Sequence, residues 1–217
     1  MDVVLPAFAW LCLAALIVLS PQAGPHRVRR QAAEIAAGLR TRHAFTDAPD
    51  IEHVWPTTEP PCHYGTRHTI TDAVTGSIDG LPVTSATYTC RYNGSTHLYG
   101  LIAITLPDPA ERLEIRHGAV FESAWVLDTP PDGATHAGSH AFDDQYELYF
   151  PDRADGAMGL LSEDGIAAMV QAPDKFSLRA TDRRLLLWRR DGWSGDVAVV
   201  AAVRAGVGVV SAVRLVG

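Results

Sequence analysis

The sequence predicts an α+β protein, with an N-terminal transmembrane helix followed by one antiparallel-sheet domain that has helices packed on one face. Three observations lead to this prediction. A long uncharged apolar run, residues 3–19, opens the sequence. Stretches rich in alternating or β-branched residues follow, and Asp-Gly and Asn-Gly pairs typical of hairpin turns separate them. After residue 154, apolar residues recur at helical spacing.

Composition narrows the class of protein. The 217 residues are 47% hydrophobic and 20% charged, which is too apolar for a disordered chain. A formal net charge of -7 disfavours nucleic acid as a partner. Three cysteines are too few for a disulfide scaffold. We therefore expect a domain with an ordinary hydrophobic core.

The apolar run is predicted to be a membrane anchor, within residues 1–20. As a helix it reaches roughly 25 Å, slightly less than the ~30 Å hydrocarbon core of a bilayer. A cleaved signal peptide is the alternative, but only Met1 and Asp2 precede the run, and Pro21 stands where a cleavage site needs a small residue. Arginines follow the run, and cationic flanks stay in the cytoplasm. We expect a single-pass protein of the cell membrane whose domain faces the cytoplasm.

A juxtamembrane helix is predicted within residues 21–47, where good helix formers surround Ile35 and Leu39, which lie four apart on one face. Its basic residues are the predicted membrane-surface residues, which either only set the orientation of the span or contact anionic lipid at about 1 kcal/mol each. They are Arg27, Arg29 and Arg30.

The next segment, residues 48–65, is Pro-rich and without periodicity, and it is predicted to be a linker along the surface. An α+β globular domain is then expected over residues 66–217. Its predicted strands are 67–74, 82–92, 97–106, 113–116, 120–126, 145–150, 176–180 and 185–190. Residues 107–109 are expected to stop the third strand, and residues 181–183 to join the last two strands as a hairpin.

Two helical segments complete the domain. Residues 154–170 have helical period, and Ser162 before Glu163 and Asp164 predicts a helix N-cap, so two short helices are expected to meet there. Residues 196–216 are expected to form a helix packed on the sheet, although their β-branched content leaves a strand open. A second membrane span would place Arg204 in the bilayer at a cost of roughly 3 kcal/mol.

No complete catalytic or cofactor-binding motif is present in the sequence. The low-probability metal candidates are His136 and His140, four residues apart, with Asp143 and Asp144 after them. These histidines lie in a Gly/Pro-rich loop without the glutamate of the zinc protease motif, so we expect exposed loop residues, no metal and no cofactor. A metal-dependent hydrolase that uses these four residues is the alternative function.

Cys62 and His63, with Cys90 and His97, are a possible set of metal ligands, but they lack the paired cysteine spacing of a zinc site. We therefore expect one buried thiol and one loop thiol. If the domain lay outside the cytoplasm they could form a disulfide, and the chain would then be a secreted disulfide-bonded domain. The densest basic cluster is expected to be a solvated hairpin face, and contact with lipid headgroups or phosphate is the alternative. It consists of Arg183, Arg184, Arg189 and Arg190.

Ordered motifs run along most of the chain. After the span and its arginines come residues 65–67, 75–83 with Tyr88, 106–107, 113–115, 142–148, 160–161 and 185–188. In this order they resemble a class of uncharacterised, single-pass, membrane-anchored bacterial proteins of the kind found in high-GC actinobacteria. That class has basic residues where this sequence has Asp143-Asp144, and a proline where it has Ser162. The resemblance implies an α+β cytoplasmic domain on a membrane tether and brings no established activity.

The tether and the lack of a catalytic set predict a non-enzymatic module at the inner face of the membrane. Its expected partner, besides the membrane held by the N-terminal helix, is a protein or a lipid of unknown identity.

Overall fold

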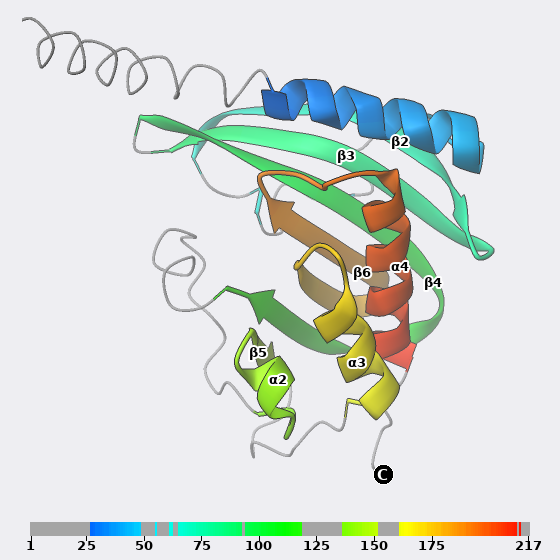
Figure 1. Ribbon diagram of the computed structural model, residues 1–217, viewed down its shortest axis with the longest axis vertical. Coiled ribbons are helices and arrows are strands. Elements are labelled where there is room, and N and C mark those ends of the chain that lie inside the picture. The colour runs from blue at the N-terminus through cyan, green and yellow to red at the C-terminus, as the bar shows by residue number, and fades with distance from the viewer. Residues whose placement is uncertain are drawn as a thin grey trace, which may run out of the picture.

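The computed structural model describes residues 27–48, 55, 61–62, 65–92, 94–118, 136–151, 161–211 and 213. These residues form a six-stranded antiparallel sheet with helices, as the predicted α+β class requires (Figure 1). The predicted span, residues 3–19, and the predicted strand 120–126 lie outside this part of the chain. Within it, no helix combines the length and the apolar character needed to cross a bilayer.

The strands pair in the order β1-β2-β3-β4-β5, and β6 pairs with β4. β4 is long enough to have two successive neighbours on the same edge: β3 lies beside its first part and β5 beside its last four residues, while β6 follows the other edge. The strands are β1 (Thr46–Asp47), β2 (Thr66–Ile78), β3 (Leu81–Tyr92), β4 (Ser95–His117), β5 (Tyr146–Tyr149) and β6 (Ser177–Arg190).

β4 corrects one sequence prediction, because Pro107 and Pro109 do not stop the strand. The register between β4 and β6 shifts between Thr105 and Ala110, and again before Leu113. Since regular pairing is interrupted there, prolines that lack an N–H donor fit inside the strand. The two predicted strands 97–106 and 113–116 are therefore one bent strand.

β6 corrects a second prediction, that of a hairpin at residues 181–183. Asp182 lies opposite Ala110 and has a left-handed φ of 53°. A positive φ suits a tight turn, but it also suits a β-bulge, and here it lets β6 follow the bend of β4. The predicted strands 176–180 and 185–190 are thus one continuous strand.

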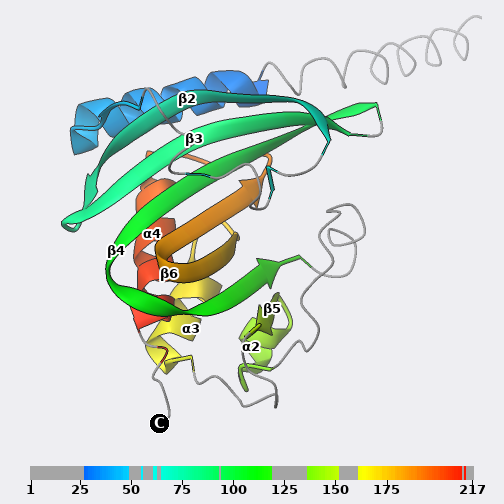
Figure 2. The ribbon, with the colours of Figure 1, turned by 180° about the vertical axis from the view of Figure 1, so that it is seen from behind.

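The helices cover one face of the sheet, and seen from behind the strands lie in front of them (Figure 2). The helix at Ser162 begins as predicted, because the Ser162 hydroxyl accepts a hydrogen bond of 3.0 Å from the Gly165 amide. The C-terminal segment is a helix on the sheet, which resolves the helix-or-strand alternative. The described helices are the N-terminal helix (residues 27–43), α2 (His140–Asp143), α3 (Glu163–Gln171) and α4 (Asp196–Ser211).

The opposite face of the sheet carries a second apolar cluster. Trp55 and Cys62, from the segment predicted to be a surface linker, are 1% and 3% exposed and pack there with Tyr88 and Trp188. The Tyr88 hydroxyl donates to the Cys62 carbonyl oxygen at 3.0 Å. The prediction of a linker did not anticipate these contacts, because it was based on the prolines of this segment and not on the side chains between them that the structure shows to be buried.

Candidate functional site at the N-terminal helix

The N-terminal helix, which carries the predicted membrane-surface residues, is built into the core. Its Ala32, Ala36 and Leu39 are at most 9% exposed, and they recur at the three- and four-residue spacing of one helix face. Small residues on this face let the helix lie close to the sheet. Ile35 and Leu39, which the sequence places on one face of a helix, are on the face toward the domain, since Leu39 belongs to the core and Ile35 packs against it.

Polar contacts fix both ends of this helix. Near its start, the Gln31 side-chain amide donates to the Trp193 and Ser194 carbonyl oxygens at 3.1 and 3.2 Å. Near its end, the Arg42 guanidinium forms two hydrogen bonds with the Asp196 carboxylate, at 2.6 and 2.5 Å. The Asp196 side chain is only 8% exposed and lies in the first turn of α4, whose dipole favours a carboxylate there. The helix is therefore joined to α4 and to the loop between β6 and α4.

The space beneath the helix is small, whereas the space beside its first turns is open. A cavity of about 20 Å³ lies between the helix and the sheet, near Ser85, Thr87 and Trp193. That volume suits roughly one water molecule. A surface groove of about 480 Å³ lies beside the first helical turns, and Arg27, Arg30, Gln31, Glu34 and Ser194 line it.

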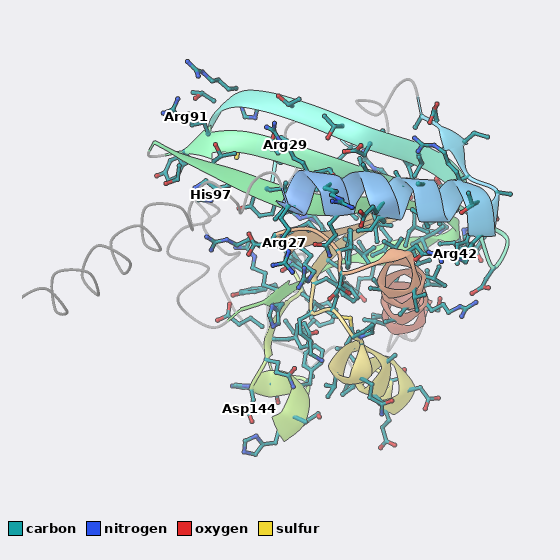
Figure 3. All side chains as sticks on the ribbon, turned by 45° about the horizontal axis from the view of Figure 1, so that its top comes forward. Arg27, Arg29, Arg42, Arg91, His97 and Asp144 are labelled. Atoms are coloured by element: carbon teal, nitrogen blue, oxygen red, sulfur yellow. The ribbon has the colours of Figure 1, made fainter. Side chains whose placement is uncertain are left out.

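Basic side chains from several elements gather at the end of the domain where the helix begins. Figure 3 places Arg27, Arg29, Arg91 and His97 there, and Arg42 at the far end of the helix. We call this region the basic end. It comprises Arg27 and Arg29 of the helix, Arg67 of β2, Arg91 of β3, His97 of β4 and Arg190 of β6.

The sequence predicted the helical members of the basic end, Arg27 and Arg29, together with Arg30. Arg30 is paired with Glu34 at 2.9 Å, and both side chains are well exposed. Among the strand members, Arg190 was considered for lipid contact only as part of the basic cluster in residues 183–190, and the others were missed because they lie far apart in the sequence. Their shared feature is that each stands within three residues of a strand terminus, but this places them together only once the strand pairing is known.

The four metal candidates do not converge. His140 Nδ1 lies 2.8 Å from a carboxylate oxygen of Asp144 on an exposed helical turn. The Asp143 carboxylate instead accepts the Ala137 amide at 2.8 Å, and His136 is exposed. Among the described residues, no group of three or more such side chains is arranged to hold a metal ion. Asp143 and Asp144 instead make local contacts within the loop and the short helix α2.

The basic cluster of β6 is divided between different surroundings. Arg189 lies 3.6 Å from the buried Asp174 carboxylate, whereas Arg183 and Arg190 are exposed. Trp188 packs in the outer cluster, and Trp193 lies in the inner core. The sequence predicted one solvated face, and the structure does not show one.

Both described cysteines are free and buried. Burial, with the nearby Cys90 thiol as a second cause, raises the pKa of the Cys62 thiol to about 12. Burial also raises the pKa of Cys90, although a hydrogen bond with Tyr88 opposes this shift.

We expect Cys62 in the folded protein to react with a maleimide at pH 8 roughly a thousandfold more slowly than an exposed cysteine, because the thiolate is the reacting form. Stopped-flow labelling with and without urea measures this, since unfolding exposes both thiols. Fast labelling of the folded chain would contradict the burial, and a disulfide found by intact mass in protein from cells would favour the secreted alternative.

The fold and the site define the class to which this protein belongs: an α+β domain whose helices, the N-terminal helix included, cover one face of a bent antiparallel sheet, with arginines gathered where that helix begins. No family model and no curated protein matches the chain.

Among solved structures the chain is similar to the mycobacterial trehalose monomycolate transport factor A, TtfA, with a TM-score of 0.54. The match covers 85% of this chain and 96% of that chain at 13% sequence identity. At this identity the likeness shows the fold. The mycobacterial source of the neighbour agrees with the actinobacterial type of the resemblance seen in the sequence.

Proposed function

We propose that this chain is a non-enzymatic binding module, held at the inner face of the cell membrane by residues 1–20, which binds a protein or a lipid. The observation that carries the proposal is the position of the N-terminal helix. The arginines that follow the apolar run belong to a helix that is packed into the sheet domain and joined to α4 through Arg42 and Asp196. A tether that leads into such a helix gives the domain a fixed place next to the bilayer.

The binding surface is expected on the outside of the domain. The cavity under the N-terminal helix, at about 20 Å³, has no room for an acyl chain or a sugar. The open groove and the basic end lie beside that helix. The neighbour with this fold is described as a transport factor for trehalose monomycolate, which supports a lipid-related role without chemistry on the lipid.

The predicted topology is tested with the full chain carrying Val197→Cys in bacterial cells. Val197 is 72% exposed on α4, so a cysteine there is open to a membrane-impermeant maleimide. We expect labelling only after lysis, and retention of the chain in the membrane after alkaline carbonate extraction.

The unsubstituted chain is the matched control, because both of its described cysteines are buried. Labelling of Val197→Cys in intact cells would overturn the inner-face topology, and it would favour the secreted alternative. Release by carbonate would overturn the anchor.

A further inference from the structure

The strand members of the basic end are neighbours across the sheet. Arg91 lies opposite Thr66 on one side, next to Arg67, and opposite Thr96 on the other, next to His97. Arg190 lies opposite Tyr99 on the following strand pair. The ends of four strands therefore present basic groups in one row.

The helix start lies beside the end of this row. A Cβ built on Gly192, two residues after Arg190, would lie 3.8 Å from a Val28 methyl and 3.3 Å from a Leu98 methyl. Val28 stands between Arg27 and Arg29. The arginines of the helix and those of the strands thus share one surface.

These arginines are exposed and have no acidic partner within salt-bridge distance in the part of the chain that the structure describes; they are Arg27, Arg29, Arg67, Arg91 and Arg190. Elsewhere on the surface, Arg40 pairs with Asp47 and Arg204 with Asp79. The exposed Asp191 is the one carboxylate adjacent in sequence to this set, and Glu34, which lines the groove with Arg27, is paired with Arg30. Five arginines that are unpaired among the described residues therefore share this surface on a chain whose net charge is -7.

We propose that the basic end docks on the surface of an anionic lipid bilayer, so that the strand ends face the membrane. This inference rests on the proposed tether. Seven residues lie between Leu19 and Arg27, and the eight steps along the chain span at most about 29 Å when fully extended. An embedded apolar run therefore keeps the basic end within reach of the headgroups. Each arginine at the surface strengthens docking roughly fivefold, and salt weakens it.

The test uses the full chain in nanodiscs of phosphatidylcholine, with or without phosphatidylglycerol. Thr96→Cys places a thiol on the exposed hairpin between Arg91 and His97, and Ser211→Cys places one at the exposed end of α4. The reaction rate with a water-soluble maleimide reports the exposure of each. We expect Thr96→Cys to be protected only in discs with phosphatidylglycerol, high salt to remove that protection, and Ser211→Cys to react equally in both.

Two double variants with the same change in net charge complete the design. Arg91→Gln with Arg190→Gln is expected to lower the ratio of docked to undocked chain roughly 25-fold. Arg183→Gln with Arg184→Gln, six or seven residues from Arg190 along β6, should leave it unchanged.

Equal reactivity of Thr96→Cys in both kinds of disc would overturn the docking. It would favour an acidic protein as the partner of the basic end. Failure of the tether is recognised separately, because carbonate then releases the chain from the discs. In that case docking is measured by co-sedimentation of the chain with phosphatidylglycerol vesicles. A chain that does not sediment with these vesicles would also overturn the proposal.

Discussion

Replacing Glu114 with alanine is expected to lower the free energy of unfolding by about 3–5 kcal/mol. Glu114 is 1% exposed and accepts from two guanidinium groups, Arg116 at 2.5 Å and Arg179 at 2.9 and 2.7 Å. Both arginine side chains are at most 19% exposed. Without the carboxylate, the buried Arg116 and the partly buried Arg179 would both lose the buried negative charge to which they donate. Urea unfolding of the purified full chain, followed by circular dichroism, measures the loss.

Two further variants separate charge from packing. Glu114→Gln keeps the size of the side chain and removes its charge, so a loss close to that of Glu114→Ala would assign the effect to electrostatics. Glu34→Ala removes the partner of the exposed Arg30 and is expected to cost less than about 1 kcal/mol. A Glu114→Ala protein as stable as Glu34→Ala would show that the buried pairs contribute little.

The residues around Glu114 show which features of the fold a local sequence pattern can predict and which it cannot. Alternation in a strand places Leu113 and Ile115 on one face, and both are completely buried in the inner core. The same alternation puts Glu114 on the other face, where a single sequence suggests solvent. Its burial depends on Arg179, 65 residues away, and no local pattern contains that pairing.

Long strands show a second limit of the sequence. At Asp182 a small polar residue takes a positive φ. This local feature suits both a turn and a β-bulge, so the sequence alone does not distinguish them. Two prolines within three residues, Pro107 and Pro109, mark an interruption of pairing, but they do not show whether the chain reverses or continues. Where the two paired strands are adjacent in the sequence, as β2 and β3 are at the Asp79-Gly80 turn, the sequence predicted the connection correctly.

The candidate site likewise contains residues that the sequence predicted and residues that it did not. Arg27 and Arg29 were predicted because they follow the apolar run directly. Arg67 and Arg91 look like ordinary polar residues near strand ends, and Arg190 is one of a basic cluster expected to lie on a hairpin face. Only the register brings these three arginines to one side of the molecule. The packing of the N-terminal helix on the sheet was also beyond local pattern, because its buried face is made mainly of alanines, which a solvated helix also favours.

Replacing Trp193 with alanine is expected to cost about 3–5 kcal/mol, which is comparable to the loss at Glu114. Trp193 is 3% exposed, and its ring lies 5.9 Å from that of Phe176. The indole also packs on Gly100, where an added Cβ would lie 2.4 Å from its Cδ1 atom. Its backbone oxygen accepts from Gln31, so the same residue holds the N-terminal helix. The loss is measured by urea unfolding as above.

A double-mutant cycle with Gly100→Ala tests this close contact directly. Alone, Gly100→Ala is expected to cost about 1–3 kcal/mol, because the new methyl group overlaps the indole ring. In the Trp193→Ala protein the ring is gone and only the backbone nitrogen of residue 193, at 3.1 Å from the added Cβ, stays close. Most of the cost of the methyl group should therefore disappear, and the loss of the double variant should be smaller than the sum of the two single losses. Gly195→Ala is the matched control, since a Cβ there meets no atom within 4 Å. Full additivity of Gly100→Ala and Trp193→Ala would mean that the indole does not lie against β4, and the loop that holds the helix would then have to be placed differently.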